Sequence, residues 1–224
     1  MGLFDSFFGK VLYFPGCAPK FLDKDVMQRH KQLLNLFGIS FVTLPELEVC
    51  CGKPALDYGF LEDFKDLKRK NSAVFEAHKI KKIITGTPEA YYIFKKKYDD
   101  IPVEYIGQTI LDNVDKLEKK YEGQAVTYFD PCNPYKLPEL YSIPREILTA
   151  VGLKVVNLSA CKQKSMCCGK ALEHISPKVG DEMGRAILGE VKTKTLITTS
   201  TSCYLQLKGL SKSVRVRELS EVLL

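Results

Sequence analysis

The sequence lacks the features that mark membrane-spanning proteins and nucleotide-binding enzymes. No segment approaches the roughly 18 uncharged apolar residues that a membrane-spanning helix needs. No Gly-x-Gly-x-x-Gly motif follows a predicted strand, so no nucleotide site is evident. The opening residues, MGLFDSFFGK, contain neither a charged leader nor a long apolar stretch, and they are a poor secretory signal. We therefore expect a cytoplasmic protein.

Positive charge is too dispersed to indicate a nucleic-acid-binding protein. The net charge is +6, but the lysines occur in short groups at the ends of predicted helices, where solvation favours them. A basic stripe with interleaved aromatic residues is not evident. Leu3, Phe4, Phe7 and Phe8 can contact a partner or a membrane surface, although a frayed or self-packed end is the favoured interpretation.

Cysteine, in contrast, is abundant, and it occurs twice in the same order. Each half of the chain has a lone cysteine, then a Cys-Cys-Gly triplet, then a third site after a strand. The first half has Cys17, then Cys50 and Cys51, then Thr87 to Ala90; the second has Cys132, then Cys167 and Cys168, then Ser200 to Cys203. The lone cysteine precedes its pair by 33 residues in the first half and by 35 in the second. The chain is therefore predicted to be a tandem repeat.

The repeat extends beyond the cysteines and sets the predicted domains. IITGTPEAYYIF, residues 83–94, aligns position by position with LITTSTSCYLQL, residues 196–207. Each half has about the size of a small domain. We expect two lobes, residues 1–114 and 125–224, joined by a charged connector over residues 115–124.

Hydrophobic patterns predict alternating strands and helices in both lobes. Strands are predicted at 11–14, 39–44, 82–85, 125–129, 154–158 and 195–199, and helices at 23–37, at 60–78 and from Pro144 onward. Gly38 and Gly152 are predicted to end helices. This alternation indicates an α/β fold in which each lobe is a small, mainly parallel sheet covered by helices.

The predicted fold brings the cysteines together. Cys17, Cys132 and Cys203 each follow a strand, and each Cys-Cys-Gly triplet lies in the loop after another strand. Because parallel strands present their carboxyl ends at one edge of the sheet, these thiols should converge there. The glycine after each pair can adopt a positive φ or let the backbone pass close to a bulky inorganic group.

Four converging thiols in the second lobe suit a metal centre. Cys132, Cys167, Cys168 and Cys203 can ligate an iron–sulfur cluster or tetrahedral zinc. Adjacent cysteines without the tight knuckles of structural zinc sites favour the cluster, with zinc or an unmetallated thiol site as the alternative. Buried cysteines packed as small apolar residues would explain one thiol, such as Cys161, but not a repeated set.

These motifs resemble the cysteine-rich CCG domain family, which includes a subunit of heterodisulfide reductase, the glycolate oxidase iron–sulfur subunit and lactate-utilisation proteins. The resemblance rests on PGC at 15–17, CCGKPA at 50–55, DPC at 130–132 and the second Cys-Cys-Gly, and it covers nearly the whole chain. It implies two α/β lobes, iron–sulfur clusters, and a role in electron transfer or disulfide reduction.

Departures from the family pattern limit what the resemblance implies. The trailing Cys-x-x-Cys of the family falls on Thr87 and Ala90 in the first lobe, and on Ser200 and Cys203 in the second. The first lobe thus keeps Cys17, Cys50 and Cys51, which can bind a metal with one open position or remain as a relic. The second keeps four thiols rather than five, so an ordinary [4Fe–4S] cluster is expected. Ser200 could supply a rare oxygen ligand, but it is expected to cap the following helix.

Two functions remain after these observations. The first is an iron–sulfur subunit that passes electrons between a flavoprotein or ferredoxin-like partner and an acceptor, with disulfide reduction at the cluster as a further option. Such a subunit would serve a heterodisulfide-reductase-like or 2-hydroxy-acid-oxidising complex. The second is a non-catalytic binding or assembly module in which zinc or a cluster only stabilises the fold.

Overall fold

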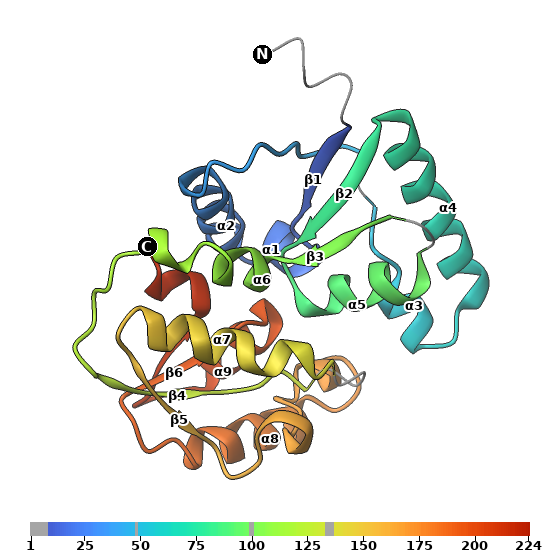
Figure 1. The fold of residues 1–224 in the computed structure, drawn as a ribbon. Coiled ribbons are helices and arrows are strands. Elements are labelled where there is room, and N and C mark those ends of the chain that lie inside the picture. Colours follow the sequence, from blue (N-terminus) through green and yellow to red (C-terminus); the bar gives the residue numbers. More distant parts are fainter. Residues whose placement is uncertain (1–8, 48, 99–100, 133–136) are drawn as a thin grey trace. The chain divides into compact units, whose positions relative to one another are not determined.

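The computed structural model describes residues 9–47, 49–98, 101–132 and 137–224 (Figure 1). The chain divides into two compact units, residues 1–109 and 110–224. Each unit contains one parallel sheet with helices packed against it, and the predicted α/β tandem repeat is confirmed. The lobe boundaries at residues 114 and 125 stay a prediction.

Unit 1 contains a three-stranded parallel sheet in the order β1-β2-β3. Its strands are β1 (Lys10–Phe14), β2 (Ile80–Thr85) and β3 (Val103–Tyr105). Its helices are α1 (Cys17–Phe21), α2 (Lys24–Leu36), α3 (Lys53–Asp57), α4 (Leu61–Ala77) and α5 (Pro88–Lys97). Helix α6 (Ile106–Leu111) and the short turn η2 (Val114–Lys116) continue the chain into unit 2.

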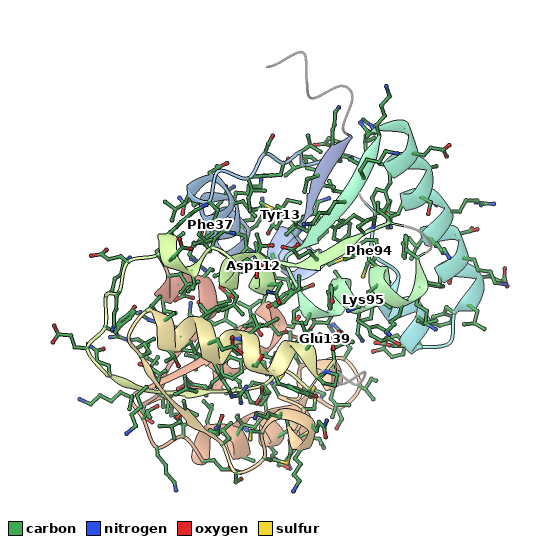
Figure 2. All side chains as sticks on the ribbon, viewed as in Figure 1. Tyr13, Phe37, Phe94, Lys95, Asp112 and Glu139 are labelled. Carbon is green, nitrogen blue, oxygen red and sulfur yellow. The ribbon has the colours of Figure 1, made fainter. Side chains whose placement is uncertain are left out.

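The side chains of β1 alternate between the two faces of this sheet. Leu12 and Phe14 join a buried cluster with residues of α4 and α5. Phe94 of α5 lies within that cluster, its ring 4.8 Å from that of Phe14 (Figure 2). Tyr13 points to the other face and meets His30 of α2. Helices therefore cover both faces of the sheet.

Unit 2 contains a four-stranded parallel sheet in the order β5-β4-β6-β7. Its strands are β4 (Ala125–Tyr128), β5 (Lys154–Asn157), β6 (Thr195–Thr198) and β7 (Arg215–Glu218). Its helices are α7 (Glu139–Ala150), α8 (Pro177–Gly189) and α9 (Thr201–Leu210), with short turns η3 (Lys162–Lys164), η4 (Lys170–Leu172) and η5 (Leu219–Val222). Phe129, Leu196 and Leu207 lie in its buried core.

The segment 39–44 is not the strand that the sequence predicted. It forms one isolated bridge, between Val42 and Leu12. Two backbone hydrogen bonds hold it, from Tyr13 N to Val42 O at 2.9 Å and from Val42 N to Val11 O at 2.8 Å. Pro15, whose backbone nitrogen would be the next in β1 to face this segment, has no N–H to donate, so the pairing does not extend. The segment nevertheless occupies the sheet-edge position that β5 holds in unit 2.

The prediction that a helix begins at Pro144 is also wrong. Helix α7 begins at Glu139, after Pro138 at the N-cap, and Pro144 lies inside it. Proline in a helix interior removes one backbone hydrogen bond and costs about 3 kcal/mol. Here Ile143, Pro144 and Ile147 are all buried, so packing offsets that cost.

Two further predictions concern the chain ends and membranes. Leu3, Phe4, Phe7 and Phe8 lie outside the residues that the structure describes. Within the described ranges, none of the helices combines the length and the apolar character that a membrane crossing requires.

The contact between Tyr13 and His30 makes one prediction about pH. Tyr13 Oη lies 2.9 Å from His30 Nδ1, and His30 is only 3% exposed. Burial, and secondarily the charge of Arg29, lower the pKa of His30 from 6.5 to about 3. Between those values the unfolded chain binds a proton that the folded chain does not. The contribution of neutral His30 is therefore complete above about pH 6.5 and is lost as the pH falls towards 3.

We expect His30→Gln to remove this part of the acid sensitivity. The free energy of unfolding of the wild-type chain should fall faster than that of the variant below pH 6, by up to about 1.4 kcal/mol per pH unit. Denaturant unfolding at pH 7, 6, 5 and 4 measures this difference. His174→Gln is the control, because the His174 side chain is 93% exposed. Parallel pH profiles for wild type and His30→Gln would contradict the prediction.

Candidate metal centre

The four cysteines predicted as ligands in unit 2 lie together at the carboxyl edge of its sheet. Cys132 follows β4, Cys167 and Cys168 lie in the loop after β5, and Cys203 lies in the first turn of α9. The sulfur atoms of Cys168 and Cys203 are 3.1 Å apart. Cys167 is hydrogen-bonded to Cys132 on one side and to Cys168 on the other. The four thiols thus form one continuous chain of contacts.

The glycine after the cysteine pair holds this loop in shape. Gly169 has a φ of 88°, in the left-handed region, and its backbone N–H donates to Cys167 Sγ at 3.4 Å. A Cβ atom on Gly169 would lie 2.0 Å from the carbonyl oxygen of Gly180 in α8. Both the backbone conformation and the close approach of α8 therefore require glycine.

Unit 1 repeats this arrangement with three cysteines. Cys50 is hydrogen-bonded to Cys17 and to Cys51. Gly52 has a φ of 93°, and its backbone N–H donates to Cys50 Sγ at 3.4 Å. Cys17 is exposed, whereas Cys51 is buried. The structure thus brings together the three cysteines of the predicted incomplete set.

The position of Cys203 is taken in unit 1 by Ala90. Ala90 is 1% exposed, so an apolar methyl group fills the place of a thiol. Thr87 Oγ1 accepts a hydrogen bond from Ala90 N at 3.4 Å and caps α5. Ser200 occupies the equivalent N-cap position of α9, but its side chain does not form the capping hydrogen bond that the sequence predicted. The side chains present in unit 1 therefore serve the helix rather than a ligand set.

Two residues that sequence analysis missed hold the cysteine pair of unit 1. Asn71 Nδ2 donates to the carbonyl oxygen of Cys50 at 3.0 Å and to Tyr98 Oη at 2.9 Å. Tyr98 Oη in turn donates to the carbonyl oxygen of Cys51 at 3.3 Å. Asn71 is the polar member among the buried positions of α4, beside Phe64 and Phe75. A single amide on the apolar face of a helix is the signal that could have identified it.

The thiols of each set have divergent pKa values. Hydrogen bonds from Cys132 and Cys168 lower the pKa of Cys167 to about 2, and hydrogen bonds from Cys17 and Cys51 lower that of Cys50 to about 3. Three of the thiols that donate those bonds, Cys132, Cys168 and Cys51, have raised pKa values because of the same hydrogen bonds, and burial raises them further. Each set therefore holds a thiolate at its centre, and binding of a metal would release protons from the thiols beside it.

The donor chemistry fits a thiolate-ligated metal group. Among the described residues, no group of three or more His, Cys, Asp or Glu side chains is placed to hold a metal ion without rearrangement. Four thiolates around one zinc would be separated by about 3.8 Å, so the 3.1 Å contact of Cys168 with Cys203 is a thiol–thiol hydrogen bond. Binding would require these side chains to rotate apart. Four sulfurs from three loops, with a backbone N–H directed at one of them, fit an iron–sulfur group in ligand type and number.

Neither set is completed by Cys161, His174 or His30. Cys161 is half-buried and lies just before η3. His174 pairs with Glu173 at 3.9 Å on the surface. His30 is buried against Tyr13, away from solvent.

The fold and the thiol sets define a class: a duplicated α/β protein whose parallel sheets present cysteines at their carboxyl edges. The sequence matches the cysteine-rich domain family twice, over residues 11–95 and 126–208. The chain belongs to this family, and the predicted resemblance is confirmed.

The chain is similar to several named relatives. It is 27% identical to a subunit of fumarate reductase (CoM/CoB) from Methanothermobacter marburgensis, over 89% of this chain and 42% of that protein. It is 31% identical to "EtfAB:quinone oxidoreductase" of Syntrophomonas wolfei, over 71% of this chain and 24% of that protein. It is 26% identical to a subunit of the dihydromethanophenazine:CoB–CoM heterodisulfide reductase of Methanosarcina barkeri, over 71% of this chain and 42% of that protein.

The chain therefore spans less than half the length of these curated relatives. Among solved structures it is similar to glutamate racemase RacE1 of Bacillus anthracis. That match has 12% identity and a TM-score of 0.44, over 96% of this chain and 79% of that one.

The close approach at Gly169 predicts the effect of a single methyl group. Gly169→Ala should destabilise unit 2, because it forces a side chain into the left-handed region and against the Gly180 carbonyl. Backbone strain alone costs roughly 1–3 kcal/mol. The midpoint of denaturant unfolding measures the loss.

Gly189→Ala is the matched control for this substitution. Gly189 ends α8, and a Cβ there would meet nothing within 4 Å. This variant should unfold like wild type or at slightly higher denaturant concentration. Equal stability of the Gly169→Ala and Gly189→Ala variants would refute the role assigned to Gly169.

Proposed function

We propose that this chain is an iron–sulfur electron-transfer protein in which Cys132, Cys167, Cys168 and Cys203 hold a [4Fe–4S] cluster. The contact chain of four thiols at one sheet edge is the observation that carries the proposal. The names of the relatives support it, since they describe oxidoreductases or their subunits. When bound, the cluster would accept and release single electrons. The chain's own residues fix the sulfurs, and the N–H of Gly169 stabilises the charge on Cys167.

We further propose that the chain works with other redox subunits. It covers less than half of each named relative, so the electron donor and acceptor would lie on other chains or on further domains. A flavoprotein or a ferredoxin-like protein suits this role, within a complex that reduces a disulfide or oxidises a 2-hydroxy acid. A reducing, cytoplasmic location would keep the eight cysteines free of disulfide bonds, as they are in the structure.

Cys17, Cys50 and Cys51 are proposed as a second, incomplete site. Three thiols in contact can bind a metal and leave one position open to a further ligand. The exposure of Cys17 gives that position access to solvent. The alternative is a loop that keeps only a structural role, which the buried Ala90 and the helix-capping Thr87 favour.

A second candidate function is a binding or assembly module stabilised by zinc. The observation in its favour is the same loss of ligands in unit 1, because a protein that moves no electrons needs only one metal to stabilise its fold. Four thiolates from unit 2 would suffice for tetrahedral zinc. Such a protein would take up no electrons reversibly.

Metal analysis separates these functions. Protein purified without oxygen should contain about four irons and an equal amount of acid-labile sulfide per chain. Cys168→Ser should abolish the visible iron–sulfur absorption, whereas Cys161→Ser, the matched control outside both sets, should retain it. One zinc without sulfide, or full absorption in Cys168→Ser, would overturn the assignment.

The incomplete site predicts a smaller and separate effect. If unit 1 binds metal, Cys51→Ser should lower the metal content by the amount in excess of one cluster and leave the absorption of the unit 2 cluster intact. Elemental analysis of Cys51→Ser beside Cys161→Ser measures this. Identical metal content in both variants would assign Cys17, Cys50 and Cys51 a structural role only.

A further inference from the structure

Asp130, two residues before Cys132, forms a buried ion pair with Arg145. The Asp130 carboxylate and the Arg145 guanidinium form two parallel hydrogen bonds, Nη1 to Oδ1 at 2.8 Å and Nη2 to Oδ2 at 2.7 Å. The side chains are 2% and 14% exposed, respectively. Bidentate pairs of this kind fix relative orientation as well as distance.

Asp130 also forms hydrogen bonds to the loop that precedes Cys167. Its Oδ2 accepts a hydrogen bond from Lys162 N at 2.8 Å, and its backbone oxygen accepts one from Ser165 Oγ at 2.5 Å. Lys162 has a φ of 54°, an unfavourable left-handed conformation for a residue with a side chain. One residue thus joins the loop that carries Cys132 to the loop that carries Cys167.

Arg145 is held by hydrogen bonds on every nitrogen of its guanidinium group. Beyond Asp130, it donates to Asn157 Oδ1 from Nε at 3.0 Å and from Nη2 at 2.9 Å, and to the Tyr141 carbonyl at 2.6 Å. The guanidinium carbon lies 4.9 Å from the centre of the Tyr128 ring. These bonds account for all five of its N–H donors. Asn157 ends β5, so Arg145 links α7, β4 and β5 beneath the cysteine loops.

Unit 1 has no such pair at the equivalent positions, both of which the structure describes. Counted from the lone cysteine, Pro15 stands where Asp130 stands, and His30 stands where Arg145 stands. His30 contacts Tyr13 at the positions where Arg145 contacts Tyr128, so the pairing of these positions is kept while the charges are absent. The unit that lacks the fourth cysteine thus also lacks the ion pair.

The loop before the cysteine pair differs in the same way. Cys50 follows Val42 by eight positions, whereas Cys167 follows the equivalent Val156 by eleven. The longer loop contains Lys162 and Ser165, the two residues that Asp130 holds. The ion pair and the loop that it anchors occur together in unit 2.

We propose that Asp130 and Arg145 are positioning residues that hold Cys132 and Cys167 in register for the metal group and balance the charge beside it. The proposal rests on the proposed function for its redox part only. Removing either partner leaves a buried charge without its counter-charge, which is strongly destabilising locally. The sign of the remaining charge also acts on any nearby redox group.

Two opposite substitutions test the proposal in the full chain. Arg145→Met leaves the Asp130 carboxylate and should lower the midpoint potential of the reconstituted cluster at pH 8, because negative charge disfavours electron uptake. Asp130→Asn leaves the guanidinium and should raise it. The double variant should lie between the two single variants. Arg185→Met is the matched control, because Arg185 forms an exposed ion pair with Asp181 on α8.

A second measurement needs no cluster. In the metal-free chain, the rates at which Cys132 and Cys167 react with iodoacetamide should rise about tenfold or more in Arg145→Met and remain at the wild-type value in Arg185→Met. If Arg145→Met does not fold, Arg145→Lys replaces it. Lysine keeps the charge but not the bidentate geometry, so reactivity should rise while the potential stays near wild type.

The two measurements separate this proposal from the proposed function. Potentials that shift in the same direction in Asp130→Asn and Arg145→Met, or unchanged reactivity of both cysteines in Arg145→Met or its lysine substitute, would overturn the positioning role. Absence of iron in the wild-type protein would overturn the proposed function instead, and the reactivity of the metal-free chain would still decide the positioning role.

Discussion

The parallel direction of the strands is the constraint on which both thiol sets depend. Every pairing in the two sheets is parallel, so each strand delivers the residues that follow it to the same edge. Cys132 and Cys203 are 71 positions apart in the sequence, yet both follow neighbouring strands, β4 and β6. An antiparallel strand at either place would carry its cysteine to the opposite edge. The direction of the chain thus gathers the thiols at one edge of each sheet.

Helices that pack against the cysteine loops then hold these loops in place. In unit 2, Gly180 and Gly184 of α8 leave room for the backbone of Cys168 and Gly169, so the helix lies directly against the cysteine loop. In unit 1, α4 uses the larger Phe64 and Asn71, and Asn71 bonds the peptide carbonyl of Cys50. The two units thus reach the same hydrogen bond from glycine to sulfur by different packing. The two units share the turn at the glycine after the cysteine pair, and they differ in how the helix packs against that turn.

The sequence predicted most of this arrangement, because the signals for it were local or repeated. The strands at 11–14, 125–129 and 195–199 and the helix at 23–37 follow from apolar patterns, and the duplicated cysteines align the halves. Segment 39–44 has the composition of a strand, but as an edge segment it depends on partners that composition does not specify. Asp130 was visible in the DPC motif, yet its role depends on Arg145, fifteen residues away on α7, and on Lys162 in another loop. Such contacts arise only when the chain has folded.

Units 1 and 2 differ in three features around their thiols. Where unit 2 has a fourth cysteine, a longer loop and a buried ion pair, unit 1 has alanine, a shorter loop and a neutral histidine. A buried ion pair stabilises less than its close geometry suggests, since desolvation offsets much of the attraction. Stability alone is therefore a weak reason for unit 2 to retain Asp130 and Arg145. The need to fix the loops around four thiols is a stronger reason. Unit 1 has three thiols, and it keeps the fold of the site without the charges.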